Sequence, residues 1–69
     1  MNKATSKQVD RYVSMASRDP RYAANSLAIL QRSATTKKTA NEIADIIKET
    51  GLFRYLDVIN GCFVPQSNL

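Results

Sequence analysis

Apolar residues recur along the first part of the chain with the spacing of an amphipathic helix. The pattern consists of Val9, Tyr12, Val13 and Ala16. These positions follow the i, i+3, i+4, i+7 rule and so fall on one helical face. With Ser6 as a suitable N-cap, they predict a first helix over about residues 7–17.

Two further helices are predicted by the same kind of pattern. Asp19-Pro20 combines a capping residue with a proline suited to the first helical position, and predicts a second helix over about 20–33. Thr39 and Glu42 fit a capping box, and the third helix is expected over about 37–50, starting there or one turn earlier. Gly51 supplies the residue that commonly follows a helix C-terminus.

The region after Gly51 predicts a short fourth helix over about 53–60, closed by Asn60-Gly61. Its apolar residues are Leu52, Phe53, Leu56 and Ile59. Short turns between the segments favour an all-α fold, a compact bundle of three or four short helices. The 69 residues are expected to form one domain with frayed ends at 1–5 and 65–69.

Composition places the chain among folded proteins, since 43% of its residues are hydrophobic. A core of this size contributes little net stability, so self-association or a partner would help. Cys62 is the single cysteine, which excludes an intramolecular disulfide and is typical of a small apolar residue. We find no apolar run long enough for a membrane span and no secretory signal in 1–6, so a soluble cytoplasmic protein is expected.

The residue types also argue against an enzyme. The chain has no histidine, which removes the commonest general base and metal ligand, and its two glycines form no phosphate loop. Glu42, Asp45 and Glu49 share one helical face, but a helix surface spreads carboxylates apart, so we expect a solvated acidic face and neither metal nor cofactor. A site for the basic half of a partner or second copy is the other interpretation of this cluster.

Charge is distributed unevenly. Residues 1–38 contain eight Lys and Arg against two Asp, whereas 39–69 contain two against four acids, and the net charge is +4. Two ridges carry most of the basic residues. The first consists of Lys7, Arg11, Ser14 and Arg18, and the second of Arg21, Asn25, Ala28 and Arg32, with Lys37 and Lys38 at the following turn. Each ridge is expected opposite the apolar face of its helix, and both are expected to point in a shared direction as one continuous basic surface. Arg and Lys suit phosphate groups, so this surface predicts binding to a polyanion.

An ordinary solvated helix face is the competing interpretation of both ridges. The scarcity of acids within them favours a binding surface, because a merely solvated face usually mixes both signs. All three tyrosines follow an arginine, as Arg11-Tyr12, Arg21-Tyr22 and Arg54-Tyr55. We expect these rings at the boundary of the core, with contact to phosphate or an unpaired base as the alternative.

The segment from Thr39 to Val64 resembles parts of helix-turn-helix and winged-helix regulators. It carries Glu42-Ile43-Ala44, then Gly51-Leu52, then the predicted fourth helix, which in those families would be a recognition helix in the major groove. The resemblance covers less than half of the chain. Six residues separate the two motifs, more than is usual, and the fourth segment carries Asp57 with a single basic residue, Arg54.

The function expected from the sequence is that of a small nucleic-acid-binding regulator, as in bacterial, plasmid or phage accessory proteins. It would hold the phosphate backbone, more readily of a duplex than of a single strand, through eight residues: Lys7, Arg11, Arg18, Arg21, Asn25, Arg32, Lys37 and Lys38. The alternative is a protein-interaction module or inhibitor that docks an acidic or nucleic-acid-binding protein. A homodimer or larger homo-oligomer, with the basic half of one copy on the acidic helix of another, is also compatible with the charges.

Overall fold

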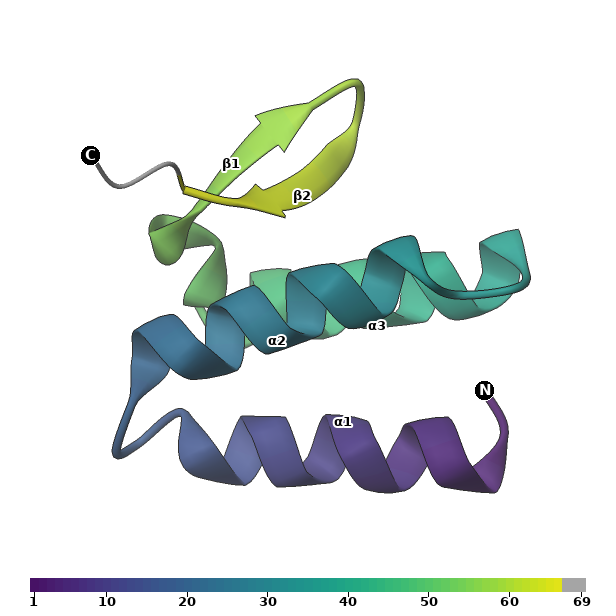
Figure 1. The fold of residues 1–69 in the computed structure, drawn as a ribbon, viewed down its shortest axis with the longest axis horizontal. Coiled ribbons are helices and arrows are strands. Elements are labelled where there is room, and N and C mark those ends of the chain that lie inside the picture. Colours follow the sequence, from purple (N-terminus) through teal and green to yellow (C-terminus); the bar gives the residue numbers. More distant parts are fainter. Residues whose placement is uncertain (67–69) are drawn as a thin grey trace.

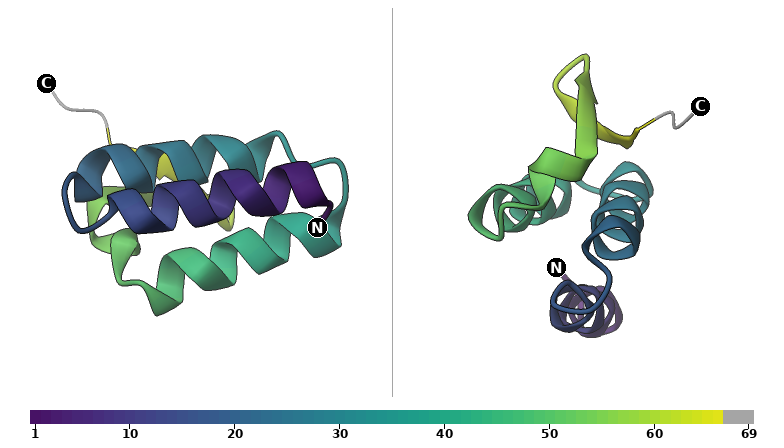
Figure 2. Two further views of the ribbon diagram at one scale, coloured as in Figure 1. Left: turned by 90° about the horizontal axis from the view of Figure 1, so that it is seen from below. Right: turned by 90° about the vertical axis from the view of Figure 1, so that its left-hand side faces the viewer.

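A computed structural model describes residues 1–66, which form three helices followed by a small β-hairpin (Figure 1). The helices are α1 (Lys3–Met15), α2 (Pro20–Arg32) and α3 (Lys37–Glu49). A 3₁₀ turn, η1 (Leu52–Tyr55), leads into strands β1 (Leu56–Ile59) and β2 (Cys62–Pro65). The helices lie side by side with alternating direction, and the hairpin stands on the side of α2 and α3 that faces away from α1 (Figure 2).

The first helix begins four residues earlier than the sequence pattern predicts. The Asn2 side-chain oxygen accepts a hydrogen bond from the Thr5 backbone N–H at 2.8 Å, so Asn2 is the N-cap in place of Ser6. The amino group of Met1 lies 3.4 Å from the Glu42 carboxylate on α3, which ties the chain start to another helix. Residues 3–5, which the sequence predicted to fray, are thus part of α1.

The second and third helices agree with the predicted ranges to within one residue. Asp19 accepts from the Tyr22 N–H at 3.1 Å, and Pro20 occupies the first helical position, as expected. In α3 the cap lies one turn earlier than the predicted Thr39 box, because the Thr36 hydroxyl accepts from the Thr39 N–H at 3.2 Å. Glu42 is thereby left free to meet Met1.

The fourth predicted helix, over 53–60, is wrong. Asn60 and Gly61 have φ angles of 53° and 78°, and this pair of left-handed residues forms a tight turn between β1 and β2, with Ile59 opposite Cys62. The fold is thus mostly helical with a two-stranded antiparallel sheet, and only in part the expected all-α bundle. The segment that would be the recognition helix in helix-turn-helix regulators is therefore a 3₁₀ turn and a hairpin, so the resemblance does not extend to it.

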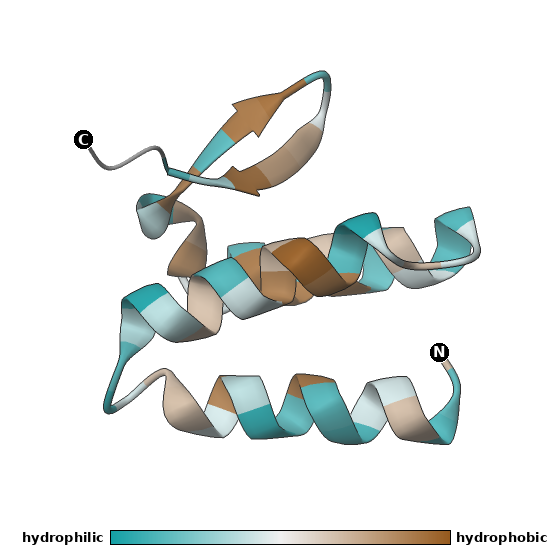
Figure 3. Ribbon diagram, in the orientation of Figure 1, coloured by the Kyte–Doolittle hydropathy of each residue, from teal (hydrophilic) through white to brown (hydrophobic). Residues whose placement is uncertain are grey.

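One hydrophobic cluster joins all three helices and the hairpin. Leu27, Ile43 and Ile47 are completely buried at its centre. Three alanines on α2 let the neighbouring elements approach closely, namely Ala23, Ala24 and Ala28. The remaining members are Val9, Leu52, Leu56 and Phe63. Hydrophobic colour accordingly gathers in the middle of α2 and on both strands (Figure 3).

The two ends of the described chain differ from simple frayed tails. Gln66 Nε2 lies 3.4 Å from the Arg54 carbonyl oxygen and donates to it. Of the predicted frayed segment 65–69, Pro65 closes β2, and residues 67–69 lie outside the described part.

Each of the described helices is too short and too polar to cross a membrane.

Candidate nucleic-acid interface

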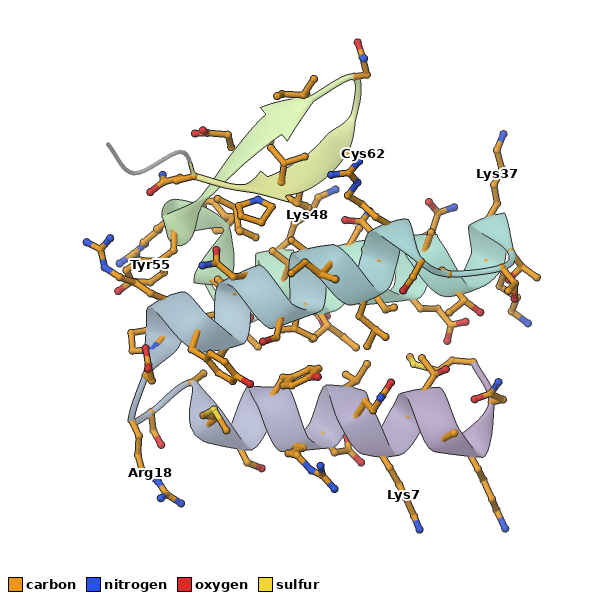
Figure 4. All side chains as sticks on the ribbon, in the orientation of Figure 1. Lys7, Arg18, Lys37, Lys48, Tyr55 and Cys62 are labelled. Atoms are coloured by element: carbon orange, nitrogen blue, oxygen red, sulfur yellow. The ribbon has the colours of Figure 1, made fainter. Side chains whose placement is uncertain are left out.

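The outer face of α1 carries a row of exposed basic side chains. We call this row the α1 face, and it consists of Lys3, Lys7, Arg11 and Ser14 on α1 together with Arg18 in the turn that follows the helix. The opposite side of the helix is turned inward, with Val9 buried and Tyr12 and Val13 half-buried. Figure 4 shows Lys7 and Arg18 pointing away from α2. The predicted ridge opposite the apolar side of the first helix is therefore present.

Lys3 belongs to this row although it is not among the predicted site residues, because the predicted helix begins only at residue 7. It lies four residues before Lys7, so the two share one side of the helix once residues 3–6 are helical. The signal that could have found it is Asn2, an N-cap residue type as good as Ser6.

The length of the α1 face suits a nucleic-acid backbone. At a rise of about 1.5 Å per residue, the helix from Lys3 to Met15 is about 18 Å long. One strand of B-DNA carries a negative charge about every 3.4 Å along the axis, so about five phosphates occupy that length. Lys3, Lys7 and Arg11 lie within that length, and Arg18 lies in the turn just beyond it.

The cations of the α1 face are not neutralised by the protein's own acids. Among residues 1–66, the ion pair between the Met1 amino group and Glu42 is the sole salt bridge. Asp10 is the one acid on α1, and it is exposed at the border of the α1 face without an ion-pair partner among those residues. The face is therefore free to attract phosphates.

The second predicted ridge does not join the first. The Arg21 guanidinium carbon lies 5.8 Å from the centre of the Tyr55 ring of η1. Asn25 is half-buried and Ala28 is fully buried, so the middle of this ridge offers little to a partner. Arg32 lines a cavity together with residues of the hairpin.

The expected continuous surface over both helices is therefore wrong. The physical reason is the hairpin, which packs on the side of α2 where the second ridge lies, across the molecule from the α1 face (Figure 2). The structure instead brings Arg32 close to Lys37, since both line one cavity. Lys37 and Lys38 are exposed in the first turn of α3, and Lys37 points to the side opposite Lys7 and Arg18 (Figure 4).

The acidic cluster and the tyrosines occupy separate places. Glu42 is half-buried beside Met1, while Asp45 and Glu49 are exposed. Within the described residues, no group of three acidic or cysteine side chains converges to hold a metal ion. Tyr12 and Tyr22 meet edge to face between α1 and α2, with 6.5 Å between the ring centroids. Tyr12 is half-buried at the boundary of the core, as expected, whereas Tyr22 is 51% exposed.

Comparison of the chain with models of protein families, with curated proteins and with solved structures gave no match.

Proposed function

We propose that this protein is a non-enzymatic nucleic-acid-binding protein that holds the phosphate backbone through the α1 face. The single observation that supports the proposal most strongly is the row of exposed cations on one side of α1, without an acidic partner in the described chain. The proposed site keeps Lys7, Arg11 and Arg18 of the predicted residues and adds Lys3, because the remaining predicted residues lie on other surfaces.

The α1 face would act through charge and hydrogen bonding. Arg11 and Arg18 each present a planar group that can donate to two phosphate oxygens, while the lysines act as compact charges. The Ser14 hydroxyl lies between the two arginines along the helix and can donate to a phosphate oxygen. Backbone contacts of this kind provide affinity and position but carry no sequence information. We therefore propose binding with little sequence preference.

The proposal is tested by the salt dependence of binding. Fluorescence anisotropy of a labelled duplex, titrated with the protein at several NaCl concentrations, gives the observed association constant. Four neutralised phosphates predict a slope of log K against log salt of about −3.6 on duplex DNA and about −2.8 on a single strand. Absence of binding at about 50 mM salt, or a slope near zero, would exclude this function.

A second function is the docking of an acidic protein on the hairpin, on the side of the molecule opposite the α1 face. The specific observation in its favour is the hairpin, where Val58 and Ile59 are 62% and 57% exposed and a phosphate backbone has nothing to offer them. Charge would speed association and the apolar residues would prolong the complex. This function predicts that Val58→Lys abolishes capture of the acidic protein, whereas nucleic-acid binding through α1 predicts that Val58→Lys leaves DNA affinity unchanged or higher.

A further inference from the structure

Strand β1 has an open edge. Among residues 1–66 the sheet consists of β1 and β2 alone, and β2 lies between β1 and helix α2 (Figure 1). The other edge of β1 therefore carries backbone groups that no strand of the described chain meets. A two-stranded hairpin is marginally stable by itself and gains from further strands. Because the hairpin lies on the side of the molecule away from the α1 face, the proposed function does not use this edge.

The register of the hairpin determines which backbone groups the edge presents. Ile59 and Cys62 flank the two-residue turn and are therefore joined by a backbone hydrogen bond. In an antiparallel pair, residues that bond to the neighbouring strand alternate with residues whose N–H and C=O point away from it. Val58 consequently directs both of its groups outward. The Leu56 carbonyl and the Asn60 N–H point in the same direction.

The edge lacks the features that usually prevent strand pairing. Edge strands are commonly protected by lysine, proline or a bulge, and β1 contains none of these. The side chains of Val58 and Ile59 are both more than half exposed. Within residues 52–66 the charges of Arg54 and Asp57 cancel, whereas the whole chain carries +4. The hairpin is thus a surface at which two copies can meet without the repulsion that their net charge causes elsewhere.

We propose that a second copy of this protein pairs with the β1 edge. The two β1 strands run antiparallel about a two-fold axis at Val58, and each copy adds its two strands to one continuous sheet. The Val58 N–H of each copy donates to the Val58 carbonyl of the other. The Asn60 N–H of each copy donates to the Leu56 carbonyl of the other, so the outward groups of the edge all gain a partner. The two Val58 side chains become neighbours across the strands.

Asp57 selects this register over the adjacent one. An axis at Asp57 would place two carboxylates directly opposite each other, which destabilises a strand pair. It would also require the Leu56 N–H, which already donates to the Phe53 carbonyl. With the axis at Val58, each Asp57 lies opposite Ile59 of the other copy, and no like charges face each other. Since the paired segment is short, the dimer is expected to be weak and to form at high protein concentration.

The proposal is tested by the mass of the protein in solution and by contacts between copies. In sedimentation equilibrium, the mean mass should rise from 7.7 kDa toward twice that value between about 10 µM and about 1 mM protein. Facing residues that exchange no hydrogen bonds have Cα atoms about 4.5 Å apart. In a mixture of ¹³C-labelled and unlabelled protein, isotope-filtered NOE spectra should therefore connect the Hα of Asp57 with the Hα of Ile59 of the other copy.

Two outcomes overturn the proposal. One is a monomer at every concentration, which would leave the hairpin to an acidic protein. The other is a dimer whose NOE contacts between copies lie outside β1.

Variants of Val58 separate edge pairing from a loss of fold. Val58→Pro removes an N–H that makes no hydrogen bond within the hairpin, so it should preserve the monomer and abolish the dimer. Val58→Lys places two cations side by side at the axis and should weaken the dimer by about tenfold or more.

Ile29→Lys is the matched control for charge. Ile29 is 59% exposed on α2, close to the 62% of Val58, and gains the same charge far from the β1 edge. The dimer of this variant should match that of the wild type. Equal weakening by Ile29→Lys and Val58→Lys, or a wild-type dimer in Val58→Pro, contradicts the proposal.

Discussion

Neutralising the α1 face should remove most of the salt dependence of nucleic-acid binding. The perturbation is a triple variant, Lys7→Gln with Arg11→Gln and Arg18→Gln. All three side chains are exposed and form no salt bridge among residues 1–66, so their loss should leave the fold intact. Circular dichroism and thermal unfolding of the variant check this point before binding is measured.

The magnitude follows from the number of cations. Four phosphate contacts give a slope of about −3.6, so a rise from about 50 to 200 mM NaCl should weaken wild-type binding about 150-fold. The triple variant retains Lys3 alone, for which the slope is about −0.9 and the same rise in salt weakens binding only about threefold to fourfold. Anisotropy titrations of one duplex at four salt concentrations resolve this difference.

A matched control separates the α1 face from general charge effects. The control is Arg21→Gln with Lys48→Gln and Arg54→Gln. It also removes two arginines and one lysine, from exposed positions outside α1. Because both triple variants have a net charge three lower than wild type, a purely global effect would change both slopes equally. The reasoning is refuted if the two variants give the same slope, or if the α1 variant keeps the wild-type slope.

Further predictions concern the core, the hairpin turn and Asp10. Leu27→Ala leaves a cavity at a fully buried position and should lower the free energy of unfolding by about 2–5 kcal/mol, enough to unfold most molecules of a domain this small. Ile29→Ala is the control on the same helix. Ile29 is 59% exposed, so this variant should barely change the midpoint of urea unfolding. Gly61→Ala should lower the free energy of unfolding by about 1–2 kcal/mol, because an L-residue is strained at a φ of +78°. A clash does not contribute, since the added Cβ would meet no atom within 4 Å. An unchanged Tm would contradict this. Asp10→Asn should strengthen duplex binding about twofold to fivefold at low salt, and weaker binding in the anisotropy assay would count against the α1 face.

The helices could be predicted from the sequence because local signals and tertiary packing agree there. Asp19-Pro20 opens α2 as the sequence indicates, and Gly51, with φ +76°, follows α3 as a helix-terminating glycine should. The start of α1 was misjudged because two cap residues, Asn2 and Ser6, both precede its apolar pattern. The contact between Met1 and Glu42, separated by 41 positions, decides in favour of Asn2, and a local pattern cannot contain that information.

The hairpin was missed because Asn60-Gly61 was interpreted as a helix terminus. The same dipeptide between two apolar runs with β-branched residues is the strongest short-range signal for a two-residue hairpin turn. Leu56 and Ile59 fit helical spacing equally well, so the apolar positions alone could not choose. Burial of Leu56 and Phe63 against the helices stabilises the hairpin.

One part of the candidate site's arrangement could be predicted from the sequence because it depends on local geometry alone. The position of Lys7, Arg11 and Ser14 on one side of α1 depends only on helical geometry, which the sequence contains. Whether a second helix presents its ridge in the same direction depends on tertiary packing. The hairpin on α2 determines that direction, and the apolar pattern predicts a helix in its place.

The most direct test of the account is to observe the arginine side chains of α1 while nucleic acid is added. Nε–Hε resonances of Arg11 and Arg18 in a ¹⁵N-labelled sample should shift on addition of a duplex at about 50 mM salt, alike for unrelated sequences, and return when salt is raised. The Nε–Hε resonance of Arg21, beside Tyr55, should stay in place. Shifts confined to Arg21 or to the hairpin, with Arg11 and Arg18 unmoved, would contradict the assignment of the binding surface to α1.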